Sequence, residues 1–237
     1  MLTPDEQKIC DAAIEYVKTQ KSQLVERYAS LDVVKPDTNP VSVFMAGSPG
    51  AGKTEFSLRL LQQIKTSDIN VVRIDPDELR KGMPGYGGGN AHVFQLPVTK
   101  LVHELHASLL KNKQSFLLDG TLSNYATAKQ NVERSLKRGR SVYVYYVYQD
   151  PLQAWKFTQA REKQEGRRIM KETFITQYFS AKDTVNALKT EFGDRIVVHL
   201  VVKNSDHEII MFEKNIRSID SHLKVKYSKE SLEGAIR

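Results

Sequence analysis

The stretch 47-GSPGAGKT-54 lies between the short apolar run 41-VSVFMA-46 and the segment 55-EFSLRLLQQI-64, whose apolar residues recur at helical spacing. Its pattern, Gly-x-x-x-x-Gly-Lys-Thr, is that of a phosphate-cradling loop, in which glycines let consecutive backbone N–H groups point at one anion. The helix that follows adds the positive end of its dipole. A glycine turn that binds nothing is the alternative, but the complete pattern between a strand and a helix favours a nucleotide phosphate site.

The loop also assigns roles to single residues. Lys53 is expected to reach the β- and γ-phosphates of a nucleotide, and the Thr54 hydroxyl is expected to hold Mg²⁺. The surrounding residues supply backbone N–H groups to the phosphates. The predicted nucleotide site consists of Gly47, Ser48, Pro49, Gly50, Ala51, Gly52, Lys53, Thr54 and Glu55.

Length and charge limit the other possibilities. The 237 residues are accounted for by one α/β domain with additions, and a second independent domain is not required. Lys and Arg number 35 against 28 Asp and Glu, which gives a formal net charge of +7. This excess favours an anionic partner but does not choose among a nucleotide, a sugar phosphate, a nucleic acid and a membrane surface.

The single cysteine and the amino-terminal segment bear on the compartment. Cys10 excludes an intramolecular disulfide and a multi-cysteine metal site, which fits a reducing cytosol. The segment 1-MLTPDEQKICDAA-13 carries acids and no apolar core, so it does not resemble a signal peptide. There is no run of 18 apolar residues that could span a membrane. We therefore expect a soluble, cytoplasmic protein without membrane contact.

Apolar runs alternate with helical patterns from residue 41 onward. The expected strands are 41–46, 70–74, 115–119, 141–147 and 195–202. The expected helices between them are 53–66, 97–112, 124–138, 151–165 and 171–191. Runs rich in Val, Ile, Leu and Tyr, separated by helices, indicate an α/β fold with a parallel sheet covered on both faces.

The ends of the chain lie outside this alternation. Thr3 and Glu6 form a capping box that opens a polar helix to about Tyr28, and 34-VKPDTNP-40 reads as a linker. The predicted organisation is an N-terminal helical element at 1–33, a core at 41–203 with a lid at about 151–172, and a C-terminal extension at 204–237. The linker suggests a detachable element that packs beside the nucleotide cleft and restrains activity, with ordinary docking on the sheet surface as the alternative.

Acidic residues follow two of the expected strands. In an open parallel sheet, ligands bind beyond the carboxyl ends of the strands. Asp75 and Asp77 follow 70–74, beside the phosphate loop if the two strands are neighbours, and Asp119 and Thr121 follow 115–119. For Asp75, a role as a helix cap is at least as well supported as a role in chemistry. For Asp77 and Asp119 we favour a functional role over a structural one, because phosphoryl transfer needs carboxylates for Mg²⁺ and for the acceptor hydroxyl.

Two further segments are candidates for holding an acceptor and closing the site. The glycine-rich segment 82-GMPGYGGGNAHVFQLP-97 is long for a simple connection, which is common for functional loops. In the basic segment 151–172, Arg161 and the pair Arg167 and Arg168 flank a helix break expected at Gly166. Arginines over a bound nucleotide stabilise the charge on a phosphoryl group during its transfer. A surface flap and a solvated basic helix are the alternatives.

Taken together, 47-GSPGAGKT-54, 74-IDPD-77, 118-LDGT-121 and a lid with Arg161 followed by 166-GRR-168 resemble the zeta-toxin kinases over about 41–200. The resemblance implies a P-loop kinase fold that uses ATP with Mg²⁺. It also implies phosphorylation of UDP-N-acetylglucosamine on its sugar 3′-hydroxyl, which blocks cell-wall precursor synthesis, and restraint by an antitoxin protein.

The resemblance assigns the remaining roles. Lys53 and Thr54 contact phosphate and metal, Asp77 is the base that faces the sugar hydroxyl, and Arg161 with Arg167 or Arg168 clamps the phosphates. Asp119 stands where the best-known members have Glu before Gly-Thr, and with Thr121 it is assigned to substrate or metal-water contacts. The segment 82–97 does not match the family's substrate loop, so the acceptor is the least secure of these expectations.

Other functions stay open at this point. A P-loop kinase acting on a nucleic-acid end would use the positive charge, but no basic stripe with interleaved aromatics appears, and 143-YVYYVY-148 reads as a buried strand. A kinase for another small molecule and an NTPase switch without acceptor also fit the loop. A non-enzymatic binding protein that acts through its N-terminal helix is the remaining alternative.

Overall fold

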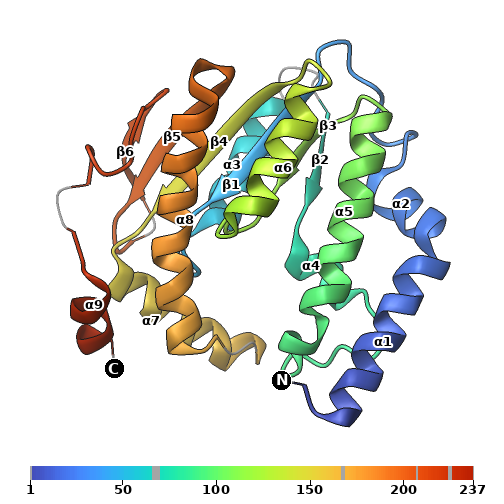
Figure 1. Cartoon of the computed structure of the whole chain (residues 1–237), viewed down its shortest axis with the longest axis horizontal. Helices are drawn as coiled ribbons and strands as arrows, with labels where there is room; N and C mark the ends of the chain where they lie inside the picture. Colours follow the sequence, from blue (N-terminus) through green and yellow to red (C-terminus); the bar gives the residue numbers. More distant parts are fainter. Residues whose placement is uncertain (1, 66–69, 167–168, 207, 224–225, 237) are drawn as a thin grey trace.

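The computed structural model describes residues 2–65, 70–166, 169–206, 208–223 and 226–236. They form a six-stranded sheet with strand order β2-β3-β1-β4-β5-β6, surrounded by helices (Figure 1). The strands are β1 (Val41–Ala46), β2 (Val71–Ile74), β3 (Ser115–Leu118), β4 (Ser141–Tyr148), β5 (Ile196–Lys203) and β6 (Ile209–Glu213). The first five run parallel to one another, and β6 pairs antiparallel with β5. The predicted α/β fold is confirmed.

The helices follow the expected alternation closely. They are α1 (Pro4–Thr19), α2 (Lys21–Ala29), α3 (Lys53–Lys65), α4 (Pro76–Lys81), α5 (Gln95–Lys111), α6 (Tyr125–Leu136), α7 (Pro151–Glu165), α8 (Lys171–Phe192) and α9 (Lys229–Ala235), with 3₁₀ turns η1 (Ala91–Phe94) and η2 (Gly193–Arg195). No helix in the described ranges is long and apolar enough to cross a membrane.

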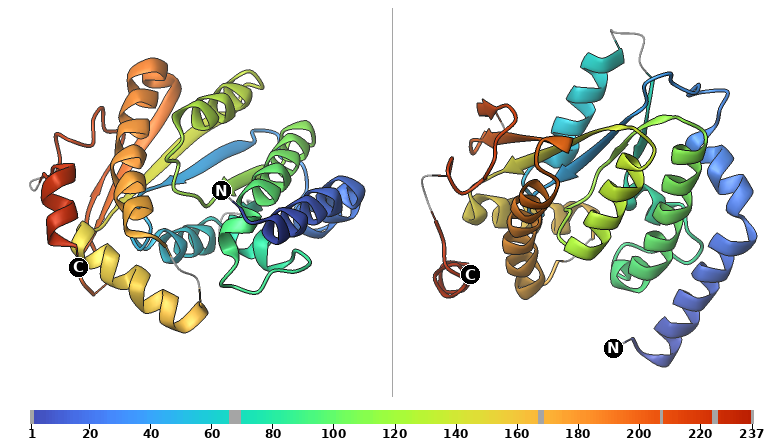
Figure 2. Two further views of the ribbon diagram at one scale, coloured as in Figure 1. Left: turned by 60° about the horizontal axis from the view of Figure 1, so that its bottom comes forward. Right: turned by 45° about the horizontal axis from the view of Figure 1, so that its top comes forward.

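The two faces of the sheet are covered unequally. Helices α5, α6 and α8 lie on one face, and α3 lies on the other (Figure 2). On the first face Phe44, Val144 and Leu200 belong to the main apolar cluster. On the second face Val43 and Met45 pack in a smaller cluster with residues of α3. The alternation of side chains along β1 therefore fills both layers, as expected for a central parallel strand.

The N-terminal element is docked on the domain. Helices α1 and α2 pack against α5, on the outside of the layer that α5 forms (Figure 2). Their buried side chains include Cys10, Val17 and Leu24, which belong to the main apolar cluster. The element is docked, but chiefly on α5 and not on the sheet surface, and a restraint of activity by this element stays a prediction. One continuous helix to Tyr28 was wrong, because the helix breaks at Gln20, whose ψ is 14°.

The C-terminal extension contributes to the same domain. Strand β6 and helix α9 were not predicted, because β6 is short, largely exposed and surrounded by polar residues. Helix α9 places Leu232 in an apolar cluster with Ala154 of α7 and Phe174 of α8. The Lys171 ammonium donates to the Ile236 carbonyl over 2.7 Å. The tail therefore supports the start of both helices that follow β4.

A neutral histidine lies in the core beside the sheet. His106 on α5 is 1% exposed and packs edge-on against Phe44 and Phe116. Burial, together with the positive charges of Arg134, Arg140 and His103, lowers the pKa of His106 to about 3. Folding therefore favours the uncharged ring.

This histidine predicts a pH-dependent stability. The folded pKa lies below the unfolded value of 6.5, so the unfolded state binds the extra proton between about pH 3 and pH 6.5. Stability should fall as the pH drops through that window, by up to about 1.4 kcal/mol per pH unit from this residue. Urea unfolding of the wild type and His106→Leu at pH 7, 6 and 5 measures the difference. His103→Leu, at an exposed position of the same helix, should keep the wild-type slope. Equal slopes for His106→Leu and the wild type would contradict the assignment.

Candidate functional site

The phosphate loop connects β1 to α3 at the carboxyl edge of the sheet. Gly47, Gly50 and Gly52 have φ values of +135°, +72° and +79°, which side chains rarely allow. A Cβ on Gly47 would lie 2.3 Å from the Val147 carbonyl oxygen, and one on Gly50 would lie 2.1 Å from that of Ala154. The glycines thus let the loop lie against the end of β4 and the start of α7.

The first turn of α3 is suited to an anion. Its leading backbone N–H groups have no partner inside the helix, and the dipole adds positive potential there. Lys53 lies in this turn, and its ammonium donates to the carbonyls of Gly47 and Ser48 over 3.0 and 2.7 Å. The lysine is therefore held over the loop, at the position where a phosphate would replace these carbonyls.

The donor set around the loop fits Mg²⁺. The Thr54 hydroxyl and the Asp119 carboxylate are hard oxygen ligands, which Mg²⁺ prefers. Among the described residues there is no cluster of three or more His, Cys, Asp or Glu that could enclose a metal. A sparse set of protein oxygens is typical of sites where phosphate oxygens and water complete the coordination. Thr54 and Asp119 remain the predicted ligands.

Asp119 belongs to a buried ionic network. Its Oδ2 accepts from the Ser57 hydroxyl over 2.8 Å and from Arg73 Nη2 over 2.7 Å. Arg73 also bonds Asp75 over 2.7 Å and Glu78 over 2.6 Å. Burial opposes the charge of Arg73, but Asp119, Asp75 and Glu78 raise its pKa above the usual value. One arginine thus fixes the acids that follow β2 and β3.

Asp75 acts as a helix cap, as the sequence indicated. Its Oδ1 accepts from the Asp77 N–H over 2.8 Å at the start of α4. Burial raises the pKa of Asp75, while Arg73 opposes that shift. Its two oxygens are therefore committed to the cap and to Arg73, and Asp77 is the acid of this pair that extends beyond them.

Asp77 lies between two arginines. Its Oδ1 accepts from Arg80 Nη1 over 2.8 Å, within α4, and its Oδ2 accepts from Arg161 Nη2 over 3.4 Å. Arg161 comes from α7, so the pair joins two elements on opposite sides of the strand-end edge. The structure therefore brings together the predicted base and one predicted lid arginine.

The route by which Asp77 reaches the site differs from the expectation. Strand β3 lies between β1 and β2, so the strand before Asp77 is not a neighbour of the phosphate-loop strand. That place belongs to β3, which ends at Asp119. Helix α4, which was not predicted, carries Asp77 from the next strand along.

The structure describes only part of the predicted lid, 151–172. Helix α7 ends at Gly166, whose φ of +69° gives the expected break. Arg161 occupies the last turns of this helix. The other two predicted lid arginines, Arg167 and Arg168, lie outside the described residues.

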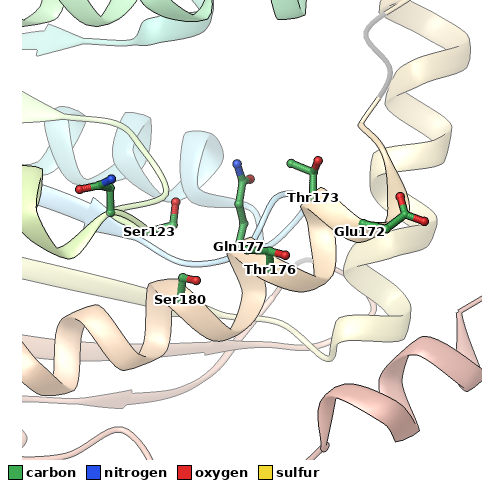
Figure 3. Close-up of a pocket in the computed structure, with 7 residues that line it drawn as sticks. Ser123, Glu172, Thr173, Thr176, Gln177 and Ser180 are labelled. Carbon is green, nitrogen blue, oxygen red and sulfur yellow. The ribbon is translucent and has the colours of Figure 1, made fainter. Parts of the chain in front are cut away.

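A polar pocket of about 390 Å³ lies beside the segment that follows β3. Figure 3 shows Thr173, Thr176, Gln177 and Ser180 along α8, with Ser123 on the neighbouring segment. The lining residues are Ser123, Asn124, Glu172, Thr173, Thr176, Gln177 and Ser180. Hydroxyl and amide groups predominate, which suits a ligand rich in hydroxyl groups.

Thr121 connects this pocket to the phosphate loop. Its carbonyl accepts from the Gly47 N–H over 3.2 Å, and its hydroxyl lies 2.9 Å from that of Ser123. The predicted substrate residue Thr121 therefore lies between the loop and the pocket. The pocket itself was not predicted, because its α8 side chains are separated from Ser123 by about fifty residues of sequence.

The glycine-rich segment 82–97 is held by hydrogen bonds within itself, and it contacts α1. The Asn90 side chain accepts from the Gly87 N–H and donates to the Gly85 carbonyl, both over 2.9 Å. His92 Nε2 lies 2.8 Å from a carboxylate oxygen of Glu6 in α1. A role of this segment in binding the acceptor stays a prediction.

Sequence reasoning missed three residues of the site. Arg73 and Ser57 hold Asp119, and the Lys203 ammonium lies 3.4 Å from the Gly52 carbonyl oxygen. Burial lowers the pKa of Lys203, which is 5% exposed. For Arg73 and Lys203 the available signal was a cation within or directly after an apolar strand, in 70-NVVRI-74 and after 195-RIVVHLVV-202. Ser57 had no such signal.

Comparisons with known proteins identify a sequence family and similar folds. The sequence model of the family described as "Zeta toxin" matches residues 25–217. A chain of the PezAT chromosomal toxin-antitoxin system of Streptococcus pneumoniae superimposes with a TM-score of 0.64 and 17% identity, over 100% of this chain and 89% of that one. No sequence among the curated proteins matches this chain.

The complex of AvrRxo1-ORF1 with AvrRxo1-ORF2 is similar in fold as well. Its structure with sulphate ions has a TM-score of 0.60 and 15% identity, over 92% of this chain and 72% of that chain. Its structure with ATP has a TM-score of 0.59 and 15% identity, over 95% and 76%. At such identities the likeness concerns the fold alone.

The close approach at Gly50 predicts a specific defect. Gly50→Ala places a Cβ against the Ala154 carbonyl, so the loop or α7 must move, and ATP affinity should fall about tenfold or more. Gly139→Ala is the matched control, because its φ of +67° is similar but its Cβ would meet no atom within 4 Å. Calorimetric ATP titration and thermal unfolding measure both variants. Equal losses in affinity would show that the effect does not depend on the contact between Gly50 and Ala154.

Proposed function

Because the chain belongs to the zeta-toxin family of P-loop kinases, we propose that it transfers the γ-phosphate of ATP to a hydroxyl of a nucleotide sugar. The acceptor we propose is the 3′-hydroxyl of UDP-N-acetylglucosamine. The observation that carries the proposal is the meeting of Asp77 with Arg161 beyond the strand ends. A kinase needs a carboxylate for the acceptor and a cation for the transferring phosphoryl group at one place.

The phosphate loop and its neighbours hold the donor. Lys53 turns from the Gly47 and Ser48 carbonyls to the phosphate oxygens, and the first turn of α3 supplies N–H groups. Thr54 and Asp119 would hold Mg²⁺, which when bound would neutralise charge on the phosphate oxygens. Arg73 and Ser57 keep the Asp119 carboxylate in one orientation.

Asp77 is the proposed base. Within the described part of the chain, its bond to Arg161, over 3.4 Å, is longer than its bond to Arg80, over 2.8 Å. An acceptor hydroxyl that donates to Oδ2 replaces Arg161 there, and Arg161 then turns to the phosphoryl group. Arg80 keeps Asp77 in place during this exchange. The carboxylate takes the hydroxyl proton late, as the phosphoryl group reaches the oxygen.

The polar pocket beside the loop is the proposed acceptor site. Its volume of about 390 Å³ lies in the range of small-molecule sites. Thr173, Gln177 and Ser123 offer hydroxyl and amide groups to a sugar. Thr121 joins the pocket to the loop, so an acceptor there lies next to the donor phosphates.

In a cell, such a reaction removes a cell-wall precursor and makes the protein a toxin. We propose that an antitoxin protein restrains it, in keeping with the toxin-antitoxin system that contains one of its structural neighbours. We further propose that it acts in the cytoplasm, where its nucleotide substrates are found.

The acid residues give a direct test. Purified protein with Mg-ATP should add one phosphate, about 80 Da, to one member of a panel of nucleotide sugars, as read by mass spectrometry. Asp77→Asn should lower this transfer about a hundredfold or more and leave ATP affinity nearly unchanged, because the residue faces the acceptor. Asp75→Asn is the control for the cap and should mainly lower the melting temperature. Full activity of Asp77→Asn would overturn the proposed base.

The pocket gives a second test. Gln177→Ala and Thr173→Ala should each raise KM for the acceptor several-fold and leave KM for ATP unchanged, since they remove hydrogen bonds to the sugar alone. Thr190→Ala, on an exposed turn near the other end of α8, should behave as the wild type. Initial rates at varied acceptor and ATP concentrations distinguish these cases. An unchanged acceptor KM in both pocket variants would show that the acceptor binds outside this pocket.

A further inference from the structure

A second pocket lies at the opposite edge of the sheet, where β1 and β4 begin. Its volume is about 360 Å³. The residues that line it are Thr38, Asn39, Pro40, Leu110, Lys111, Lys113, Arg138, Gly139, Arg140 and Ser141. The length of β1 separates this edge from the phosphate loop by about 16 Å. The nucleotide site therefore does not account for it.

Arg140 forms the buried wall of this pocket. It is 4% exposed, and its Nε donates to the Ser42 hydroxyl over 2.8 Å. Its Nη2 donates to the Val41 and Gln114 carbonyls over 2.8 and 2.6 Å. These bonds hold the guanidinium rigidly between the strand starts. None of these three partners carries a negative charge.

The charge of Arg140 is incompletely satisfied. Its Nη1 is buried and has no hydrogen-bond partner within the described part of the chain. The pKa of Arg140 is lowered to about 10, chiefly by burial, with Asp37 opposing the shift and Arg138 contributing to it. Because Nη1 is itself covered, an anion in the pocket would offset the positive charge of Arg140 through space and not by a bond to Nη1.

The other charges at the pocket reinforce this preference. Lys111, Lys113 and Arg138 are exposed at its rim. The nearby acid is Asp37, whose oxygens accept from the Asn39 N–H over 2.9 Å and the Ser115 hydroxyl over 3.1 Å. Basic residues at the ends of α5 and α6 also complement the helix dipoles, but that role does not require a pocket or a buried arginine.

We infer that this pocket binds a small phosphate monoester, such as a nucleoside or sugar monophosphate. The dianion of a monoester is complementary in charge to the buried guanidinium of Arg140 and to the three exposed cations at the rim. The volume suits a molecule of mononucleotide size. Asn39, Thr38 and Ser141 add neutral polar groups for the rest of such a ligand.

The test uses the full chain carrying Lys53→Ala, which weakens binding at the phosphate loop. Adenosine 5′-monophosphate, glucose 1-phosphate and inorganic phosphate are titrated at constant ionic strength, and backbone amide shifts are followed by NMR. The amides of Lys113, Gly139 and Ser141 should shift with saturation, and those of Gly50 and Gly52 should not. The two organic probes separate a nucleotide from a sugar phosphate as the preferred ligand.

Charge-matched variants complete the test. Lys113→Gln with Arg138→Gln should weaken binding about tenfold or more, because two cations at the rim are lost. Lys100→Gln with Arg217→Gln removes the same charge from exposed positions outside the lining and should leave the affinity unchanged. Equal weakening in both pairs, an absence of shifts at the pocket amides, or binding of an oligonucleotide without binding of a monoester would overturn the inference.

Discussion

The contact between the phosphate loop and two carbonyl oxygens sets the geometry of the site. Because Gly47 and Gly50 have no side chains, the loop lies against Val147 at the end of β4 and Ala154 at the start of α7. Arg161 follows Ala154 by seven residues, two turns along the same helix face. The packing at Gly50 therefore also aims the arginine that reaches Asp77.

Three carboxylates at this edge serve different purposes, although their sequence contexts are similar. Asp75 caps α4 and pairs with Arg73, and Asp119 is held by Arg73 and Ser57. Asp77 instead reaches Arg161 across the site. The buried Arg73 fixes two of these acids, and the third pairs with arginines of α4 and α7.

The sequence was sufficient to predict the elements that depend on local patterns. The phosphate loop, five strands and the cap role of Asp75 depend on short patterns, and they were predicted. The strand order, which separates β2 from β1, depends on contacts between distant segments. For the same reason the ionic network of Arg73 and the pocket between Ser123 and α8 were missed. The break at Gln20 was missed because no glycine or proline marks it.

The C-terminal helix α9 and the residues beside it stabilise the starts of α7 and α8. Leu232 packs with Ala154 and Phe174, Lys171 is bonded to the Ile236 carbonyl, and Tyr227 donates to Asp150, the cap of α7, over 2.8 Å. A premature stop codon near residue 225 would leave every polar residue of the site encoded. It would nevertheless remove the contacts that hold the starts of α7 and α8, so truncations that spare the whole site are expected to inactivate the protein.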